Sequence, residues 1–177
     1  MIDELKKNPP ENSVVLFFDE KGKTPIKQYE GKKWFDDRDE EENNVIYKVP
    51  GKQKVKGLVD YFAAKDFHTG RIYHAFYDWK NAFIVIDFFE RLLREIPNKI
   101  IYVILDCWSA HKKAVKLFAE LHPRLKPIFL PTNASWMNVI EQFFSHIERF
   151  VLRNSNFQSV IELMNAISSF PAFGMLI

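Results

Sequence analysis

The sequence has little of what marks secreted and membrane proteins. Its single cysteine, Cys107, has no partner for an internal disulfide. The first residues, MIDELKKNPPENS, lack the apolar stretch of a secretory signal, and no apolar run approaches the roughly 20 residues that cross a bilayer. We therefore expect a protein of the reducing cytoplasm with no membrane partner.

An excess of charge of one sign is also missing. Lys and Arg number 25 and Asp and Glu 23, so the net charge of +2 gives the whole chain no strong attraction for polyanions. The charges are unevenly spread, because acidic residues gather at 36–42 and basic ones at 48–56 and 111–116. We interpret the acidic run as a solvated loop and expect any nucleic-acid surface to come from the local basic segments.

The apolar residues that are present are enough for one globular domain. Hydrophobic residues make up 47% of the chain, and 177 residues suffice to bury roughly 70% of the unfolded surface. Continuous apolar runs predict strands covered on both faces at 14–18, 100–105 and 127–130. Segments 54–66 and 71–78, joined by a turn that contains Gly70, predict an antiparallel hairpin.

Apolar periodicity predicts four helices. They span 81–96, 109–123 with Ser109 as its N-cap, about 138–152, and 158–169. Strands separated by helices pair in parallel and hairpin strands pair antiparallel, so the sheet should be mixed. This order predicts an α/β fold of the ribonuclease H kind, a mixed five-stranded sheet covered by helices on both faces. We assign 14–170 to this domain, 1–13 to a linker remnant whose polar stretch KKNPPENS (6–13) buries nothing, and 171–177 to an apolar tail.

Two aspartates directly follow predicted strands. Asp19 follows VVLFF and Asp106 follows IIYVIL, and parallel neighbouring strands would bring both carboxylates to one edge of the sheet. Two ionised carboxylates at close range repel unless a cation such as Mg²⁺ neutralises them. Either aspartate alone is better explained as a cap of the following turn. Glu141 lies in the first turn of the third predicted helix, where the alternative is a capping box in which it reaches back to the Asn138 N–H.

In this order, the motifs FFDE, LDxxxxH and LPxxxSxxNxxE resemble the catalytic core of DDE transposases of the mariner superfamily, in particular its prokaryotic insertion-sequence branch. Thirty-four residues separate Asp106 from Glu141. The resemblance implies an RNase H-like fold whose three acidic residues hold two Mg²⁺ or Mn²⁺ ions. Asp19 would bridge both ions, Asp106 would complete one site and Glu141 the other. Such an enzyme cuts transposon ends and joins their 3′-OH strands to target DNA, and two ions about 3.5–4 Å apart suit this displacement.

The resemblance also implies supporting residues and partners. Asn138 would fix the helix start that carries Glu141, and His111 would contact the scissile phosphate, although a partly exposed histidine at a helix start is nearly as good an explanation. Double-stranded DNA is the expected partner, and synapsis of two transposon ends favours a homodimer. Five basic side chains have two equally good interpretations: they neutralise DNA phosphates, or they form a solvated helix face. They are Lys112, Lys113, Lys116, Arg149 and Arg153.

Some features depart from the family pattern. Cys107 stands where relatives often carry asparagine, and Val139 where proline is frequent, and neither supplies an essential ligand. The helix-turn-helix region that precedes the catalytic core in the family is absent from this sequence. For Trp34 and Trp136 we expect packing roles, Trp136 as a wedge that fixes the loop before the Glu141 helix. The competing hypotheses are a catalytically silent transposase remnant that binds DNA or dimerises, and a ribonuclease H-type enzyme that acts on RNA·DNA hybrids.

Overall fold

The computed structural model describes residues 1–29, 52–106, 109–132, 134–153 and 155–170, with only the backbone at 109–111 and 135. In chain order the elements are helix α1 (Ile2–Lys7), strands β1 (Ser13–Pro25), β2 (Leu58–Asp66) and β3 (Ile72–Tyr77), helix α2 (Ala82–Glu95), strand β4 (Ile100–Leu105), helix α3 (Ser109–Leu121), strand β5 (Leu125–Phe129), the 3₁₀ turn η1 (Ser135–Met137), helix α4 (Ile140–His146), the π-helix η2 (Ile147–Leu152) and helix α5 (Val160–Ser169). Within these ranges, no helix is both long and apolar enough to cross a membrane.

The five strands form one mixed sheet in the order β3-β2-β1-β4-β5. β1 pairs antiparallel with β2, which pairs antiparallel with β3, whereas β1, β4 and β5 run parallel. The turn between β2 and β3 depends on Gly70, whose φ of +74° is one that residues with a Cβ rarely adopt. The predicted mixed sheet and its hairpin are therefore confirmed.

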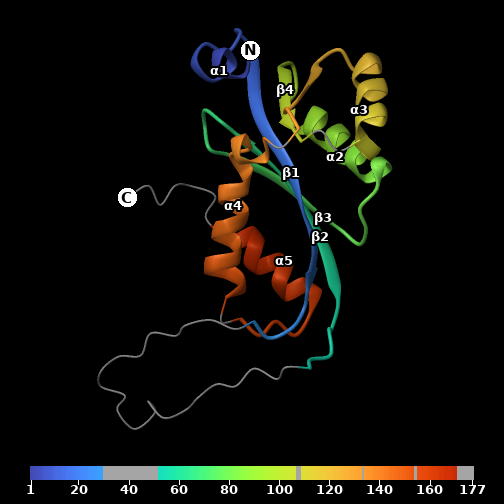
Figure 1. The fold of residues 1–177 in the computed structure, drawn as a ribbon, viewed down its shortest axis with the longest axis vertical. Coiled ribbons are helices and arrows are strands. Elements are labelled where there is room, and N and C mark those ends of the chain that lie inside the picture. Colours follow the sequence, from blue (N-terminus) through green and yellow to red (C-terminus); the bar gives the residue numbers. More distant parts are fainter. Residues whose placement is uncertain (30–51, 107–108, 133, 154, 171–177) are drawn as a thin grey trace, which may run out of the picture.

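Helices cover both faces of the sheet, as Figure 1 shows. On one face α2 and α3 pack against alternate residues of the strands. The Phe18 ring of β1 lies 5.2 Å from that of Phe88 and 5.1 Å from that of Phe89, measured between ring centroids. Such aromatic pairs add about 0.5–1.5 kcal/mol each to the gain from burial alone. The N-cap of α2 is Asn81, whose side chain accepts the Ile84 N–H, and the helix ends before Pro97.

The opposite face is covered by α4, η2 and α5. Ile140, Phe143, Phe144 and Ile147 point inward at the i, i+3, i+4, i+7 spacing of an amphipathic helix and pack against the face of the sheet that Phe17 belongs to. This is the face on which the candidate site lies.

The structure corrects three expected boundaries. β1 does not stop at Phe18 but continues to Pro25, because the polar residues after Phe18 pair antiparallel with β2. The third predicted helix changes at Ile147 from α- to π-geometry. Ser109 is the first helical residue of α3 rather than the N-cap before it.

The segment 1–13 is more than a polar linker, although its polar stretch 6–13 is exposed or only partly buried as expected. It contains α1, and the buried side chain of Leu5 packs in the same cluster as Phe17. The amino-terminal residues therefore contribute to the core on the α4 face. The assignment of 1–13 as a remnant of a linker remains a prediction, and 171–177 lies outside the described residues.

Candidate active site

Asp19 and Asp106 come together at the point where the parallel pairing of β1 and β4 ends. The last paired residues are Phe18 and Leu105, so the two aspartates are the next residues on neighbouring strands. Side chains alternate between the faces of a sheet. Phe17 and Ile104, two residues earlier, both belong to the core under α4, so both aspartates project toward that helix.

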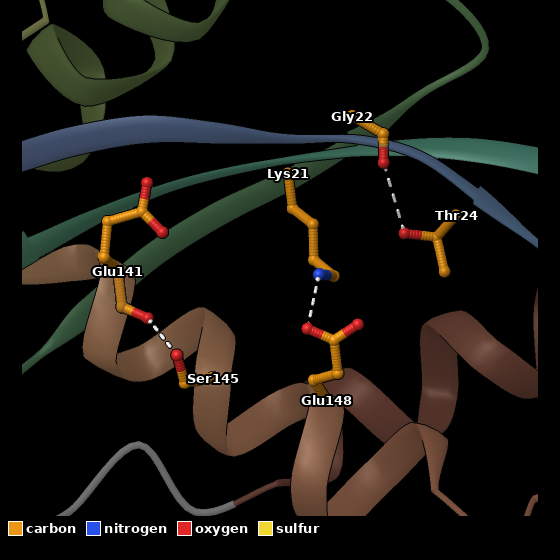
Figure 2. Close-up of polar contacts among 6 residues, drawn as sticks. All are labelled: Lys21, Gly22, Thr24, Glu141, Ser145 and Glu148. Atoms are coloured by element: carbon orange, nitrogen blue, oxygen red, sulfur yellow. Dashed lines mark hydrogen bonds and ion pairs between the residues drawn. The ribbon is translucent and has the colours of Figure 1, made fainter. Parts of the chain in front are cut away.

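Glu141 approaches the same point from α4. It lies in the first turn of the helix, and Figure 2 shows its side chain extending from the helix toward β1. A hydrogen bond joins the side chains of Asp19 and Glu141. Burial, followed by the negative charges of Glu20 and Glu141 and this hydrogen bond, raises the pKa of Asp19 to about 8, against the lowering effect of the hydrogen bond from the Glu20 amide. At neutral pH the Asp19 carboxyl group is therefore mostly protonated when no metal is bound.

The pKa of Asp106 is raised by burial and by a neighbouring negative charge, as that of Asp19 is. Burial raises its pKa, and the negative charge of Glu141 raises it further. Its buried Oδ1 atom has no hydrogen-bond partner among the described residues. An unpaired buried carboxylate oxygen is costly, because it has lost its hydration and gained nothing in return.

Asn138 ties the start of α4 to β1. Its side chain is 1% exposed, and its Nδ2 donates to the backbone carbonyl of Phe18 over 3.0 Å, directly before Asp19. α4 begins after Val139 without a side-chain cap, so the capping-box alternative for Glu141 is wrong. The geometry is the one that the predicted supporting role of Asn138 requires, since it fixes the helix start against the strand that carries Asp19.

The chemistry of this set of oxygens fits a divalent cation. Carboxylates are the ligands that Mg²⁺ and Mn²⁺ prefer, and Asn138 Oδ1, like Asp106 Oδ1, is buried and lacks a hydrogen-bond donor among the described residues. As placed, the side chains do not close around one point: no group of three acidic, histidine or cysteine residues in the described ranges is arranged to hold a metal ion. The donors fit the ion by type and charge, and side-chain rotations would have to complete its shell.

Sequence reasoning missed Glu20, whose backbone amide contacts Asp19, and Lys80, which pairs with the Glu20 side chain. The Glu20 N–H donates to Asp19 Oδ1 over 2.8 Å, while the Glu20 carboxylate points away and pairs with Lys80 Nζ at 2.6 Å. The carboxylate is only 9% exposed, so this ion pair is partly desolvated. Alternation along β1 could have placed Glu20 opposite Asp19, but nothing in the sequence links it to a lysine sixty residues later.

The predicted DNA-contacting residues lie on two different faces. Lys112 lies over the Phe129 ring, with Nζ 5.3 Å from its centroid, and Arg149 lies over that of Phe150 at the same distance. α3 and η2 cover opposite faces of the sheet, so the lysines and arginines do not share one surface. The exposed members of the set are Lys113, Lys116, Arg149 and Arg153. The side chain of His111 lies outside the described part of the chain.

The expected wedge role of Trp136 is wrong. Its side chain is 81% exposed, so it cannot fix the loop by packing beneath it. Trp34, Cys107 and the acidic run 36–42 lie outside the described residues, and their predicted roles stay predictions.

Comparison with known proteins identifies the family. Residues 14–164 match the model of the DDE superfamily endonucleases. The chain belongs to this superfamily. No curated protein matches it.

Solved structures show the same fold. The Mos1 transposase paired-end complex with the left transposon end matches with a TM-score of 0.66 at 13% identity, covering 94% of this chain and 50% of that one. The Mos1 mariner paired-end complex with Mn matches with a TM-score of 0.65 at 13% identity and the same coverage. A simian T-cell lymphotropic virus intasome matches with a TM-score of 0.54 at 11% identity, covering 94% and 50%.

These matches confirm the predicted RNase H-like fold and the resemblance to DDE transposases of the mariner kind. This DDE domain spans about half the length of the solved chains it resembles. Its placement in the prokaryotic branch remains a prediction.

Proposed function

We propose that this DDE domain is the metal-dependent catalytic core of a transposase, which cleaves DNA phosphodiester bonds at transposon ends and transfers the 3′-OH strand to target DNA. The observation that carries the proposal is the approach of Asp19, Asp106 and Glu141 from three separate segments, with Asp19 hydrogen-bonded to Glu141 and Asp106 within range of its charge. Holding acidic side chains close together in a buried place costs free energy through repulsion and lost hydration. A ligand of opposite charge best explains why the protein bears that cost.

Each residue has a defined part in this proposal. Asp19, Asp106 and Glu141 would hold Mg²⁺ or Mn²⁺, two ions in the complete site. Such ions supply charge neutralisation at the phosphate and a more acidic attacking hydroxyl or water. Asn138 keeps the start of α4 against β1, so that the Glu141 carboxylate stays beside Asp19. The Glu20 amide holds one oxygen of Asp19 in place.

The partners follow from the same reaction. Duplex DNA, both transposon end and target, would approach the α4 face. The exposed Lys113 and Lys116 on α3, which begins three residues after Asp106, would neutralise phosphates that pass this edge of the sheet. Arg149 and Arg153 lie farther along the α4 side and would contact a more distant stretch of backbone. The homodimer, the cytoplasmic location and the contact of His111 with the phosphate belong to the proposal as well.

The test is Mn²⁺-dependent nicking of supercoiled plasmid DNA by the wild-type chain and by Asp106→Asn. We expect the substitution to abolish nicking, because it removes a ligand charge while keeping the shape of the side chain. Asp78→Asn, the same change at an exposed position after β3, should nick like the wild type. Full nicking by Asp106→Asn would refute the assignment of the site.

Assays of the wild-type chain on different substrates distinguish the competing functions. Salt-sensitive duplex binding without cleavage in Mn²⁺ would identify a silent remnant, and cleavage confined to RNA·DNA hybrids would identify a ribonuclease. Nicking of duplex DNA, lost in Asp106→Asn, supports the transposase core against both.

A further inference from the structure

The turn η1 carries one strongly exposed aromatic residue between well-packed neighbours. Trp136 is 81% exposed, whereas Ala134 two residues before it is 8% exposed and Asn138 two residues after it is 1% exposed. Isolated exposed apolar side chains are common on protein surfaces, so exposure alone decides nothing. The position of this one is what matters.

The backbone that presents Trp136 is held on both sides. The Ala134 N–H donates to the Pro131 carbonyl over 3.1 Å, and the Met137 N–H donates to the Ala134 carbonyl over 3.0 Å. The buried side chain of Asn138 then fastens the end of the turn to Phe18. The indole therefore projects from a braced turn, and ordering it against a ligand would cost little backbone entropy.

The same bracing connects Trp136 to the acidic side chains. η1 lies between the end of β5 and the start of α4, and only four residues separate Trp136 from Glu141. Asn138, which closes the turn, bonds the carbonyl directly before Asp19. A ligand held by the acidic residues would thus lie beside an exposed, rigidly mounted aromatic face.

We propose that Trp136 stacks on an unpaired nucleobase of the DNA strand, next to the phosphate that the acidic residues address. This inference rests on the proposed function, which makes that ligand a DNA backbone. Every base presents a π-face to an aromatic ring, so the contact is tolerant of sequence. The base must be unpaired, because a ring on a protein surface cannot reach the face of a base that is stacked within the duplex.

The first test measures the affinity of the whole chain for a fluorescently labelled 12-nucleotide single strand and for the matching duplex. Trp136→Ala should weaken binding to the single strand by about 5- to 150-fold, the range expected for loss of one stacked base, and affect the paired duplex much less. Trp136→Phe should recover most of the affinity. The matched control is Trp79→Ala, which removes another exposed tryptophan, 65% exposed, from the loop between β3 and α2.

The second test places the contact. After the nicking position is mapped with the wild type, the base beside it is replaced by an abasic site. Trp136→Ala should nick the normal duplex more slowly than the wild type, and the two rates should become equal on the abasic duplex. Equal single-strand affinities of Trp136→Ala and Trp79→Ala would overturn the proposal, as would a rate difference that persists on the abasic duplex.

Failure of the proposed function looks different. In that case the wild type would not nick DNA in Mn²⁺ at all, whatever residue occupies position 136. If nicking is intact and Asp106-dependent while Trp136→Ala behaves as the wild type on every substrate, only the stacking proposal falls.

Discussion

Metal binding to this domain should release a proton, and the amount should depend on pH in a defined way. In the absence of metal, burial, the nearby negative charges and the bond to Glu141 hold the pKa of Asp19 at about 8. A carboxyl group with that pKa is about 90% protonated at pH 7 and about 10% protonated at pH 9. Because a carboxyl group must lose its proton to ligate a cation, binding of Mn²⁺ at pH 7 has to expel it.

The measurement is isothermal titration calorimetry of Mn²⁺ into metal-free protein, in two buffers of different ionisation enthalpy, at pH 7 and pH 9. Asp19 alone predicts release of about 0.9 proton at pH 7 and about 0.1 at pH 9. Asp106, whose pKa is also raised by burial and by Glu141, adds to the release at the lower pH. Proton release should therefore fall steeply between the two pH values.

The control is Glu162→Gln, an exposed carboxylate at the start of α5, which should leave the release unchanged. Asp19→Asn should reduce both the release and the affinity for Mn²⁺. Tight binding of Mn²⁺ with no proton release at pH 7 would show that the ion binds elsewhere or that Asp19 is already ionised, and would refute the electrostatic reasoning.

Three further predictions concern stability without metal. The raised pKa of Asp19 makes the native state bind more protons than the unfolded state between pH 4 and pH 8. The free energy of unfolding should therefore fall as pH rises through this window, by at most about 1.4 kcal/mol per pH unit. Urea titrations of the wild type and of Asp19→Asn measure this pH dependence. Asn138→Ala should lower the free energy of unfolding by about 1–3 kcal/mol, since it leaves a buried carbonyl unpaired; an unchanged urea midpoint would contradict this. Lys80→Met should lower the free energy of unfolding by about 1.5–3 kcal/mol, because it leaves the Glu20 carboxylate unpaired. Lys21→Met, at a more exposed ion pair, should lower it by about 0–1 kcal/mol. Equal losses of stability in thermal melts of the two variants would contradict this difference.

The sheet and the position of Asp19 and Asp106 at the end of the parallel β1–β4 pairing were predictable because they depend on local signals. Continuous apolar runs at 14–18 and 100–105 define strands that bury both faces, and the residue after each run is necessarily where a polar side chain can emerge. Parallel pairing of the two strands then places the two following residues, Asp19 and Asp106, on neighbouring strands. The position of Glu141 in the first turn of a helix was predictable from the amphipathic stripe of α4, which places the helix start within about two residues.

Features that depend on pairing between distant segments were not predictable. The second half of β1 has the composition of a loop and is a strand only because β2 lies beside it. The ion pair of Glu20 with Lys80 and the burial of Leu5 likewise arise from tertiary packing. The exposure of Trp136 reverses a reasonable expectation, since a tryptophan in a turn is buried only if the neighbouring elements leave a hollow for it.

The placement of the lysines around the site explains why its negative charge remains available to a ligand. Lys21 lies two residues after Asp19 on the same strand, yet its ammonium pairs with Glu148 at 3.3 Å (Figure 2). Lys80 pairs with Glu20 on the opposite face of the sheet. Had either ammonium turned to Asp19, that carboxyl group would have ionised at ordinary pH and the site would have been neutralised from within. Because both lysines are engaged by other carboxylates, Asp19 instead keeps its proton at neutral pH, and a divalent cation can replace that proton.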